Sequence, residues 1–267
     1  MFMPAVNSIP VGAPIWLDLS TSDLDRAADF YGALFGWTVL KGSQEMFGGY
    51  STAMLGDARV AGMMPKMGDP EAEAMPDMWS IYLHTADAPA TAAAVVANGG
   101  QVIVEPMDVG GLGFMSVFID PSGGFFGTWQ PDMHQGFEVF GEHGAPAWFE
   151  LMTLDFDAAT TFYSAVFGVS LKDLDGGGGA AYQTFNIDGE DVAGIMDAKG
   201  LMPEGVPSNW LVYFGVDDAD AAAAKAVELG GSIAAPPADT PWGRFALLAD
   251  PMGAIFAVIG IGDTSEN

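Results

Sequence analysis

Two carboxylates lie two residues after a tryptophan in matching segments of this chain. Asp18 follows Trp16 and Glu150 follows Trp148, each inside a short apolar run that predicts a half-buried strand. Alternate residues of a strand share a face, so each carboxylate should face the same side as its tryptophan. His84 is the only histidine in a predicted core strand, and histidine can act as an acid or base near neutral pH, here beside Asp18. The alternatives are buried acids bonded to backbone or tyrosine hydroxyls, and a solvated or hydrogen-bonded histidine.

The segment around Trp16 recurs later in the chain. PIWLDLSTSDLDRAADFYGALFGW from Pro14 matches PAWFELMTLDFDAATTFYSAVFGV from Pro146, an offset of 132 residues (146 − 14). The register continues beyond this segment, where Tyr50 pairs with Tyr182. The period is too long for a solenoid unit and predicts two homologous domains, each expected to have its own core. The predicted boundaries are 12–131 and 144–262 for the domains and 132–143 for the linker.

Each repeat contains the predicted element order βαβββ twice. A strand at 15–19 precedes a helix whose cap candidates are Thr21, Ser22 and Asp23 and whose stop signal is Gly36. Further elements are expected near 37–41, 47–55, 58–64, 79–85, 101–105, 113–119 and 124–129 as strands and at 87–98 as a helix. Four such units per chain predict an α+β fold, in which curved mixed sheets enclose clefts and the helices lie outside.

Composition excludes several classes of protein. With 35 acidic and 8 basic side chains, the formal charge of −27 leaves no basic face for nucleic acid. The absence of cysteine excludes disulfides, thiolate nucleophiles and cysteine-ligated metals. No apolar run reaches the roughly 18 residues that a membrane span requires, and the first residues lack a signal-peptide pattern. We therefore expect a cytoplasmic monomer or homodimer that does not bind membranes.

Taken in order, the motifs resemble those of the vicinal oxygen chelate superfamily, also called the glyoxalase/bleomycin-resistance/dioxygenase superfamily. The resemblance covers essentially the whole chain and rests on FYGALFGW and FYSAVFGV, VAGMMP and VAGIMD, and DPSGGFFGTWQ and DPMGAIFAVI. The chain is most similar to two-domain actinobacterial antigen-like members, described as glyoxalase-like proteins or hydroxylases. The resemblance implies two glyoxalase-like domains of tandem βαβββ modules and a small organic partner.

Metal-dependent members of the superfamily hold one divalent ion per cleft, with a ligand on the first and last strand of each unit. The matching positions in this chain are Trp16, Gly62, Ser80 and Gly127 in the first repeat and Trp148, Gly194, Leu211 and Ala257 in the second. None of these residue types is a usual ligand of a divalent metal. We therefore expect no metal and no other cofactor. The alternative is iron, nickel, zinc, manganese or magnesium held by shifted ligands such as Asp18, His84 or Glu150.

Strand alternation predicts the contents of both clefts. The expected first cleft contains Trp16, Asp18, Met64, Tyr82, His84, Phe125 and Trp129, and the second contains Trp148, Glu150, Met196, Tyr213, Ile255 and Ile259. Such aromatic surfaces with one or two carboxylates suit a flat organic molecule that is aromatic or cationic. The alternative is that the rings only fill the curved sheets. His134 and His143 fall in the linker region and are expected at the surface.

Three functions remain open from the sequence. The first is a metal-free protein that sequesters a small aromatic or cationic molecule or acts on it through Asp18, His84 or Glu150. The second is a glyoxalase-like lyase or dioxygenase with shifted metal ligands. The third is a non-catalytic structural or interaction protein whose clefts are filled with side chains.

Overall fold

The computed structural model describes residues 9–43, 48–66, 75–174 and 179–262. It confirms four successive βαβββ units. The first contains β1 (Pro14–Thr21), α1 (Leu24–Phe35), β2 (Thr38–Leu40), β3 (Ser51–Leu55) and β4 (Ala58–Pro65). The second contains β5 (Met78–His84), α4 (Ala88–Ala97), β6 (Gln101–Asp108), β7 (Gly113–Ile119) and β8 (Phe125–Pro131).

The second repeat has the same order of elements. Its first unit contains β9 (Pro146–Thr153), α5 (Phe156–Phe167), β10 (Ser170–Asp173), β11 (Tyr182–Ile187) and β12 (Glu190–Asp197). Its second unit contains β13 (Asn209–Val216), α6 (Ala219–Glu228), β14 (Ser232–Thr240), β15 (Gly243–Ala249) and β16 (Ile255–Gly260). None of the helices in these described ranges is long and apolar enough to cross a membrane.

An aspartate begins each of these helices. The side chains of Asp23, Asp87, Asp155 and Asp218 each accept a hydrogen bond from the backbone N–H three residues later. This bond satisfies a free donor and places negative charge at the positive end of the helix dipole. Gly36 follows α1 with a φ of 76°, a left-handed conformation that glycine adopts without steric cost. The chain therefore leaves α1 sharply and enters β2.

Consecutive units pair within each repeat. In the first repeat, β1 runs parallel to β4 and antiparallel to β5, while β5 runs parallel to β8. In the second repeat, β9 pairs in the same way with β12 and β13, and β13 with β16. The first and last strands of both units thus meet at the centre of each repeat. These are the strands on which the candidate site residues were predicted.

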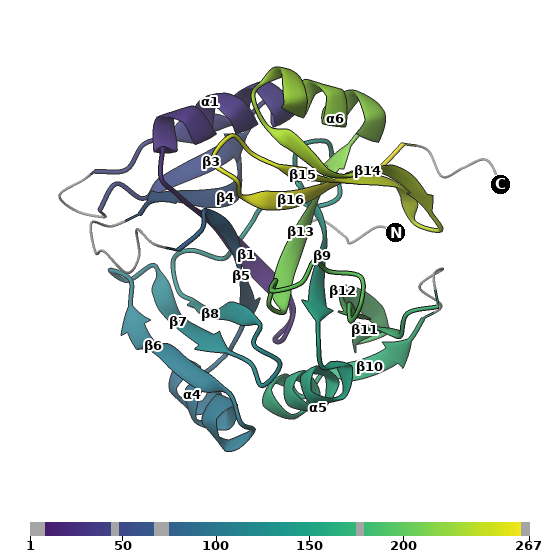
Figure 1. Ribbon diagram of the computed structural model, residues 1–267. Coiled ribbons are helices and arrows are strands. Elements are labelled where there is room, and N and C mark those ends of the chain that lie inside the picture. The colour runs from purple at the N-terminus through teal and green to yellow at the C-terminus, as the bar shows by residue number, and fades with distance from the viewer. Residues whose placement is uncertain (1–8, 44–47, 67–74, 175–178, 263–267) are drawn as a thin grey trace.

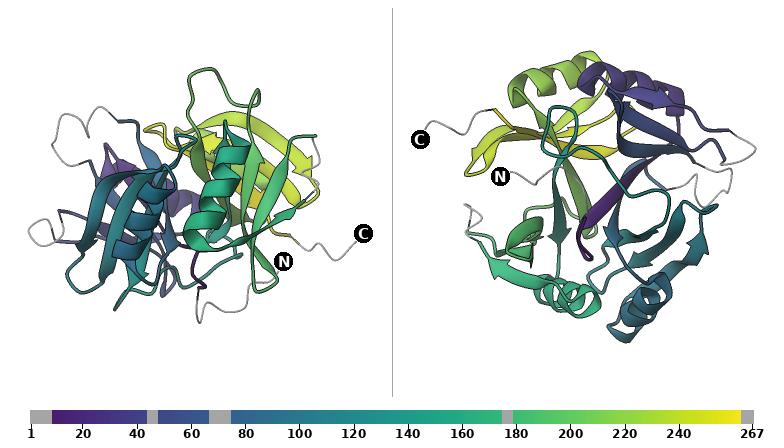
Figure 2. Two further views of the ribbon diagram at one scale, coloured as in Figure 1. Left: turned by 90° about the horizontal axis from the view of Figure 1, so that it is seen from below. Right: turned by 180° about the vertical axis from the view of Figure 1, so that it is seen from behind.

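The two repeats share their hydrophobic core. Helix α1 lies beside α6, and α4 lies beside α5 (Figures 1 and 2). The Tyr31 ring lies 5.4 Å from that of Phe256, and the Trp37 ring lies 5.4 Å from that of Phe214, centroid to centroid. One core cluster therefore contains residues of both repeats. The expectation of a separate core in each repeat is wrong, because the α1 aromatics pack on strands of the other repeat.

Two reciprocal hydrogen bonds cross between the repeats. The Tyr31 hydroxyl donates to Oδ2 of Asp250 at 3.2 Å, and the Tyr163 hydroxyl donates to Oδ2 of Asp120 at 2.8 Å. Both acceptors are the aspartates of the DPxG turns, and Oδ1 of Asp120 also accepts the Gly124 backbone N–H within its own turn. Each turn is thus fixed internally and bonded to the helix of the other repeat.

Candidate functional site

Strand register places the predicted site positions of the first repeat on one face. Asp18 of β1 pairs with Gly62 of β4, and Trp16 of β1 pairs with Tyr82 of β5. Tyr82 in turn pairs with Gly127 of β8. Residues in register across neighbouring strands point to the same side of a sheet. The structure therefore brings these five positions together.

Three ring-bearing side chains surround the Asp18 carboxyl, and we call Trp16, Asp18, Tyr50 and Tyr82 the first cage. Oδ1 of Asp18 accepts a hydrogen bond from Nε1 of Trp16 at 2.9 Å and another from the Tyr50 hydroxyl. The Tyr82 hydroxyl hydrogen-bonds to the same carboxyl. Asp18 is only 5% exposed, and these donors replace the water that it loses on burial. This is the buried, tyrosine-bonded acid that the sequence left open as an alternative.

Burial sets the protonation of the first cage. It raises the pKa of Asp18 from 3.8 to about 6, although hydrogen bonds from Tyr50, Tyr82 and Trp16 oppose the rise. Burial also raises the pKa of Tyr50 and of Tyr82 well above 10, and the nearby Asp18 charge adds to both shifts. The two tyrosines therefore stay protonated donors, while the carboxyl exchanges its proton just below neutral pH.

The first cage does not fit a divalent metal ion. A Cβ built on Gly62 would lie 1.9 Å from the Tyr50 hydroxyl oxygen, and a Cβ on Gly127 would lie 2.3 Å from the Tyr82 ring. The tyrosines thus fill the space that ligand side chains at these two positions would need. Asp18 alone supplies a strong oxygen donor, whereas divalent ions require several convergent ones. Among the residues that the structure describes, no group of three or more acidic or histidine side chains could hold a metal.

The second repeat contains a matching second cage, Trp148, Glu150, Tyr182 and Tyr213. The Tyr213 hydroxyl donates to Oε1 of Glu150 at 3.0 Å, and the Tyr182 hydroxyl also hydrogen-bonds to this carboxyl. Nε1 of Trp148 donates to the Tyr182 hydroxyl at 3.0 Å. Burial raises the pKa of Glu150, against the opposing hydrogen bonds from the two tyrosines. A Cβ on Gly194 would lie 2.1 Å from the Tyr182 hydroxyl oxygen, so a metal does not fit here either.

The linker covers the first cage. The His134 ring meets the Trp16 ring edge-on, with 4.3 Å between centroids, and lies 5.5 Å from the ring of Trp129. Nε1 of Trp129 donates to the His134 carbonyl at 2.8 Å. Burial, helped by the Arg59 charge and opposed by the Glu138 charge, lowers the pKa of His134 from 6.5 to about 4. The expectation of a surface position for His134 is wrong, because the linker folds back over β1, where Phe137 N–H donates to the Ile15 carbonyl.

The hairpin formed by β14 and β15 places two aromatic rings against the second cage, Trp242 beside Tyr182 and Phe245 beside Tyr213 at 6.2 Å between centroids. The Trp242 ring stacks on Tyr182 at 5.7 Å between centroids and 28° between planes. Trp242 itself is 44% exposed. Trp148 and Tyr213 are half-buried, whereas Trp16 and Tyr82 are almost fully buried. At these two ring positions the second cage is therefore the more accessible, whereas at the third position Tyr50 is half-buried and Tyr182 is 6% exposed.

Other predicted site residues have different surroundings. His84 hydrogen-bonds through Nδ1 to the Ile9 carbonyl at 2.7 Å rather than to Asp18. Phe125 lies at the start of β8, where it pairs with Asn209 of the other repeat. Met64 and Met196 are half-buried beside their cages. His143 is exposed and contacts Asp217, as expected of a surface residue.

The sequence prediction of the site omitted Tyr50 and Tyr182. Both hydroxyls bond directly to the carboxyl of their cage. Tyr50 and Tyr182 occupy equivalent positions in the two repeats, and this equivalence is the sequence signal that could have identified them. Tyr50 lies just before β3, where strand alternation is not yet defined.

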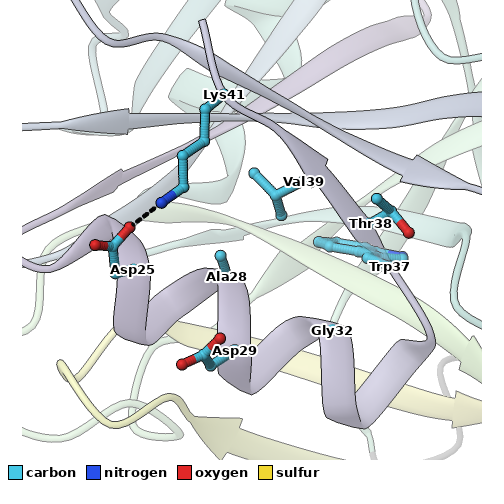
Figure 3. A pocket seen from close by; sticks show the side chains of 8 residues that line it. All are labelled: Asp25, Ala28, Asp29, Gly32, Trp37, Thr38, Val39 and Lys41. Atoms are coloured by element: carbon cyan, nitrogen blue, oxygen red, sulfur yellow. Dashed lines mark hydrogen bonds and ion pairs between the residues drawn. The ribbon is translucent and has the colours of Figure 1, made fainter.

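Two cavities lie outside both cages. One of about 630 Å³ lies between α1 and β2, with Trp37 and Val39 in its wall and the Lys41–Asp25 ion pair at one end (Figure 3). Another of about 180 Å³ lies where Val11 approaches the end of α5. The site residues predicted from the sequence line neither cavity.

Known proteins resemble this chain along most of its length. "Putative glyoxylase CFP32" of Mycobacterium bovis is 42% identical over 259 residues, covering 96% of this chain and 98% of that protein. "Anthracycline biosynthesis protein DnrV" of Streptomyces peucetius is 40% identical over 258 residues, 93% of each chain. The Mn(II)-bound glyoxalase of Novosphingobium aromaticivorans matches in structure with a TM-score of 0.64 and 18% identity, over 93% of this chain and 81% of that one.

The match to a family model follows the internal repeat. The model of the Glyoxalase/Bleomycin resistance protein/Dioxygenase superfamily matches residues 14–126 and again residues 145–258. These two ranges contain both cages and all four βαβββ units except the ends of their last strands, since β8 continues to Pro131 and β16 to Gly260. The chain therefore belongs to the Glyoxalase/Bleomycin resistance protein/Dioxygenase superfamily.

Proposed function

We propose that this protein binds a small, flat organic molecule at the second cage without a metal ion, and that the molecule is aromatic and cationic. The observation that carries this proposal is the difference in solvent exposure between equivalent residues of the two cages. Trp148 and Tyr213 stay half-exposed around the Glu150 carboxyl, whereas the equivalent residues of the first cage are sealed. Partly exposed aromatic rings above a carboxyl that is 4% exposed suit a planar cation.

Charge supports a cationic ligand. The chain carries a formal charge of −27, which raises the local concentration of cations near its surface. The two basic side chains on the flanking strands are already paired, Lys172 with Asp191 at 2.9 Å and Arg244 with Asp239 at 2.9 Å. An anionic ligand would therefore compete with carboxylates for these cations. The relative named for anthracycline biosynthesis is consistent with a fused-ring ligand.

Three two-ring probes test the proposal by calorimetric titration of the untagged protein: the cation N-methylquinolinium, neutral quinoline at pH 8, and the anion 2-naphthoate. We expect N-methylquinolinium to bind most tightly and 2-naphthoate most weakly. Glu150→Gln should weaken binding of the cation about tenfold, which corresponds to about 1.4 kcal/mol. Asp18→Asn, the matched change in the first cage, should leave the affinity unchanged. Equal affinity for all three probes would contradict the proposal.

The second candidate is the metal-dependent glyoxalase or dioxygenase, because solved structures of this fold include the Mn(II)-bound glyoxalase. Elemental analysis of untagged protein, before and after incubation with iron, nickel, zinc, manganese and magnesium, separates the two. We expect less than stoichiometric metal. One tightly held ion per chain or per repeat would favour the metal-dependent enzyme with shifted ligands.

The third candidate is a structural or interaction protein with filled cages. The first cage favours it, because Trp16 is 3% and Tyr82 is 4% exposed. We assign this structural role to the first cage and ligand binding to the second. Binding of none of the three probes would extend the structural role to both.

A further inference from the structure

Trp242 differs from every other tryptophan in the chain. Six of the seven tryptophans donate their indole N–H to a side chain or carbonyl: Trp16, Trp37, Trp79, Trp129, Trp148 and Trp210. The described hydrogen bonds of Trp242 involve only its backbone. It is also 44% exposed, whereas Trp210 of the same repeat is 5% exposed. A half-exposed indole without a hydrogen bond can rotate about its side-chain torsions at little cost.

The backbone beneath this ring is firmly held. The Thr240 hydroxyl donates to the Gly243 carbonyl and accepts the Trp242 backbone N–H at 3.2 Å. Two carboxylates, Asp220 and Asp239, bind the guanidinium of Arg244 at the start of β15. The hydrogen bonds and ion pairs of this turn therefore hold the Trp242 backbone, and the Trp242 ring itself is held by stacking on Tyr182.

The ring that Trp242 contacts is rigid. The Tyr182 hydroxyl accepts the Trp148 indole N–H and hydrogen-bonds to the Glu150 carboxyl. Tyr182 is 6% exposed, so its position is set by packing as well as by these bonds. A half-exposed ring without a described side-chain hydrogen bond thus lies over a fixed one at the edge of the second cage.

The first repeat has no equivalent ring. Gly113 opens β7 as Gly243 opens β15, and both glycines have positive φ. The residue before Gly113 is Leu112, in the place that Trp242 has before Gly243. The first cage is instead covered by His134 of the linker. Trp242 is therefore not a common packing element of the two repeats.

We infer that Trp242 is a specificity-determining residue, which swings off Tyr182 and closes on the flat face of a ligand held between the two rings. The inference rests on the proposed function and names the shape that the second cage selects: a planar ring system with two free faces. Stacking on both faces favours such a ligand over a compact cation of equal charge.

The test uses N-methylquinolinium with Trp242→Ala and Trp242→Phe, and with Leu201→Ala as a control for loss of an exposed apolar side chain. We expect Trp242→Ala to weaken binding about three- to tenfold, because one stacking face is lost. Trp242→Phe should bind within about threefold of wild type, since a ring remains. Leu201→Ala should bind as wild type does. Tetramethylammonium, which has the same charge without a flat face, should bind wild type and Trp242→Ala equally.

A second readout follows Trp242 directly. The difference in acrylamide quenching between wild type and Trp242→Phe reports the Trp242 indole, and N-methylquinolinium should reduce that difference by covering the ring. Unchanged or tighter binding to Trp242→Ala would overturn the inference and leave ligand binding at the second cage in place. Failure of wild type to bind N-methylquinolinium would overturn both, and the quenching difference would then be unaffected by the probe.

Discussion

The two cages are built from the same types of side chain, but different segments of the chain pack over them. In each, a carboxyl accepts hydrogen bonds from two tyrosines, and an indole N–H donates to one of those hydroxyls. The linker lies across the first cage, where His134 meets Trp16. The second cage is contacted by the half-exposed Trp242 ring, which stacks on Tyr182, and by Phe245 beside Tyr213. Similar hydrogen bonding can therefore serve a buried structural centre in one repeat and a more accessible surface in the other, because the covering residues come from the linker in one repeat and from the turn between β14 and β15 in the other.

The largest expected difference between the cages comes from removing their tryptophans. Trp16→Ala should lower the free energy of unfolding by about 3–5 kcal/mol, because loss of a 3% exposed ring leaves a cavity and removes one of the three donors to the Asp18 carboxyl. Trp148→Ala should cost about half as much, because Trp148 is half-buried and donates to Tyr182 instead. Urea unfolding of both variants measures the difference. Equal losses would mean that the two cages are equally buried in solution.

The next largest effect is on pH dependence. The pKa of Asp18 is about 6 in the folded protein and 3.8 ordinarily, so between these values the folded chain binds a proton that the unfolded chain has lost. Stability from Asp18 therefore falls as pH rises through this window, by about 3 kcal/mol, and stays lower above it. Asp18→Asn should remove this fall, as measured by denaturant midpoints from pH 4 to 8. A variant with the wild-type slope would show that Asp18 is solvated.

Overpacking at the glycines beside the carboxyls should have a smaller effect. A Cβ at position 62 would meet both the Tyr50 hydroxyl oxygen at 1.9 Å and Oδ1 of Asp18 at 2.1 Å, whereas at position 194 the atoms closer than 3 Å all belong to one side chain, Tyr182. We expect Gly62→Ala to destabilise the fold by about 1–3 kcal/mol and Gly194→Ala by less. Thermal unfolding of the pair gives the comparison, and a larger loss at Gly194 would reverse our ranking of the two cages.

The smallest effect concerns the cover of the first cage. The pKa of His134 is lowered by burial to about 4 from 6.5, so the unfolded chain binds a proton in this window that the folded chain does not. Stability from His134 therefore rises with pH between these values and is lost as pH falls, by about 1–2 kcal/mol after allowance for partial exposure. His134→Gln should remove this rise, opposite in sign to the effect of Asp18→Asn. If His134→Gln and Asp18→Asn changed the pH dependence of stability in the same direction, the burial of His134 would be contradicted.

The fold and the pairing of a carboxylate with a tryptophan in each cage could be predicted from local sequence patterns. The residues that lie over each cage could not. Alternation within β1 placed Asp18 beside Trp16, and the internal repeat placed Glu150 beside Trp148, since both signals are local or periodic. His134 reaches Trp16 from a linker without periodicity. Trp242 reaches Tyr182 from a turn on another unit. Contacts of this kind depend on how loops fold back over strands, which neither propensity nor spacing encodes.

The reciprocal bonds of Tyr31 to Asp250 and of Tyr163 to Asp120 also bear on how the chain assembles. Each half lacks the acceptor for its own buried tyrosine, so a half expressed alone would leave a hydroxyl and an aromatic face without partners. The linker supplies the missing half at high effective concentration. A chain cut between residues 141 and 142, in the linker after His134, should therefore behave as a pair of complementing fragments. Each fragment would depend on the other for its folded state.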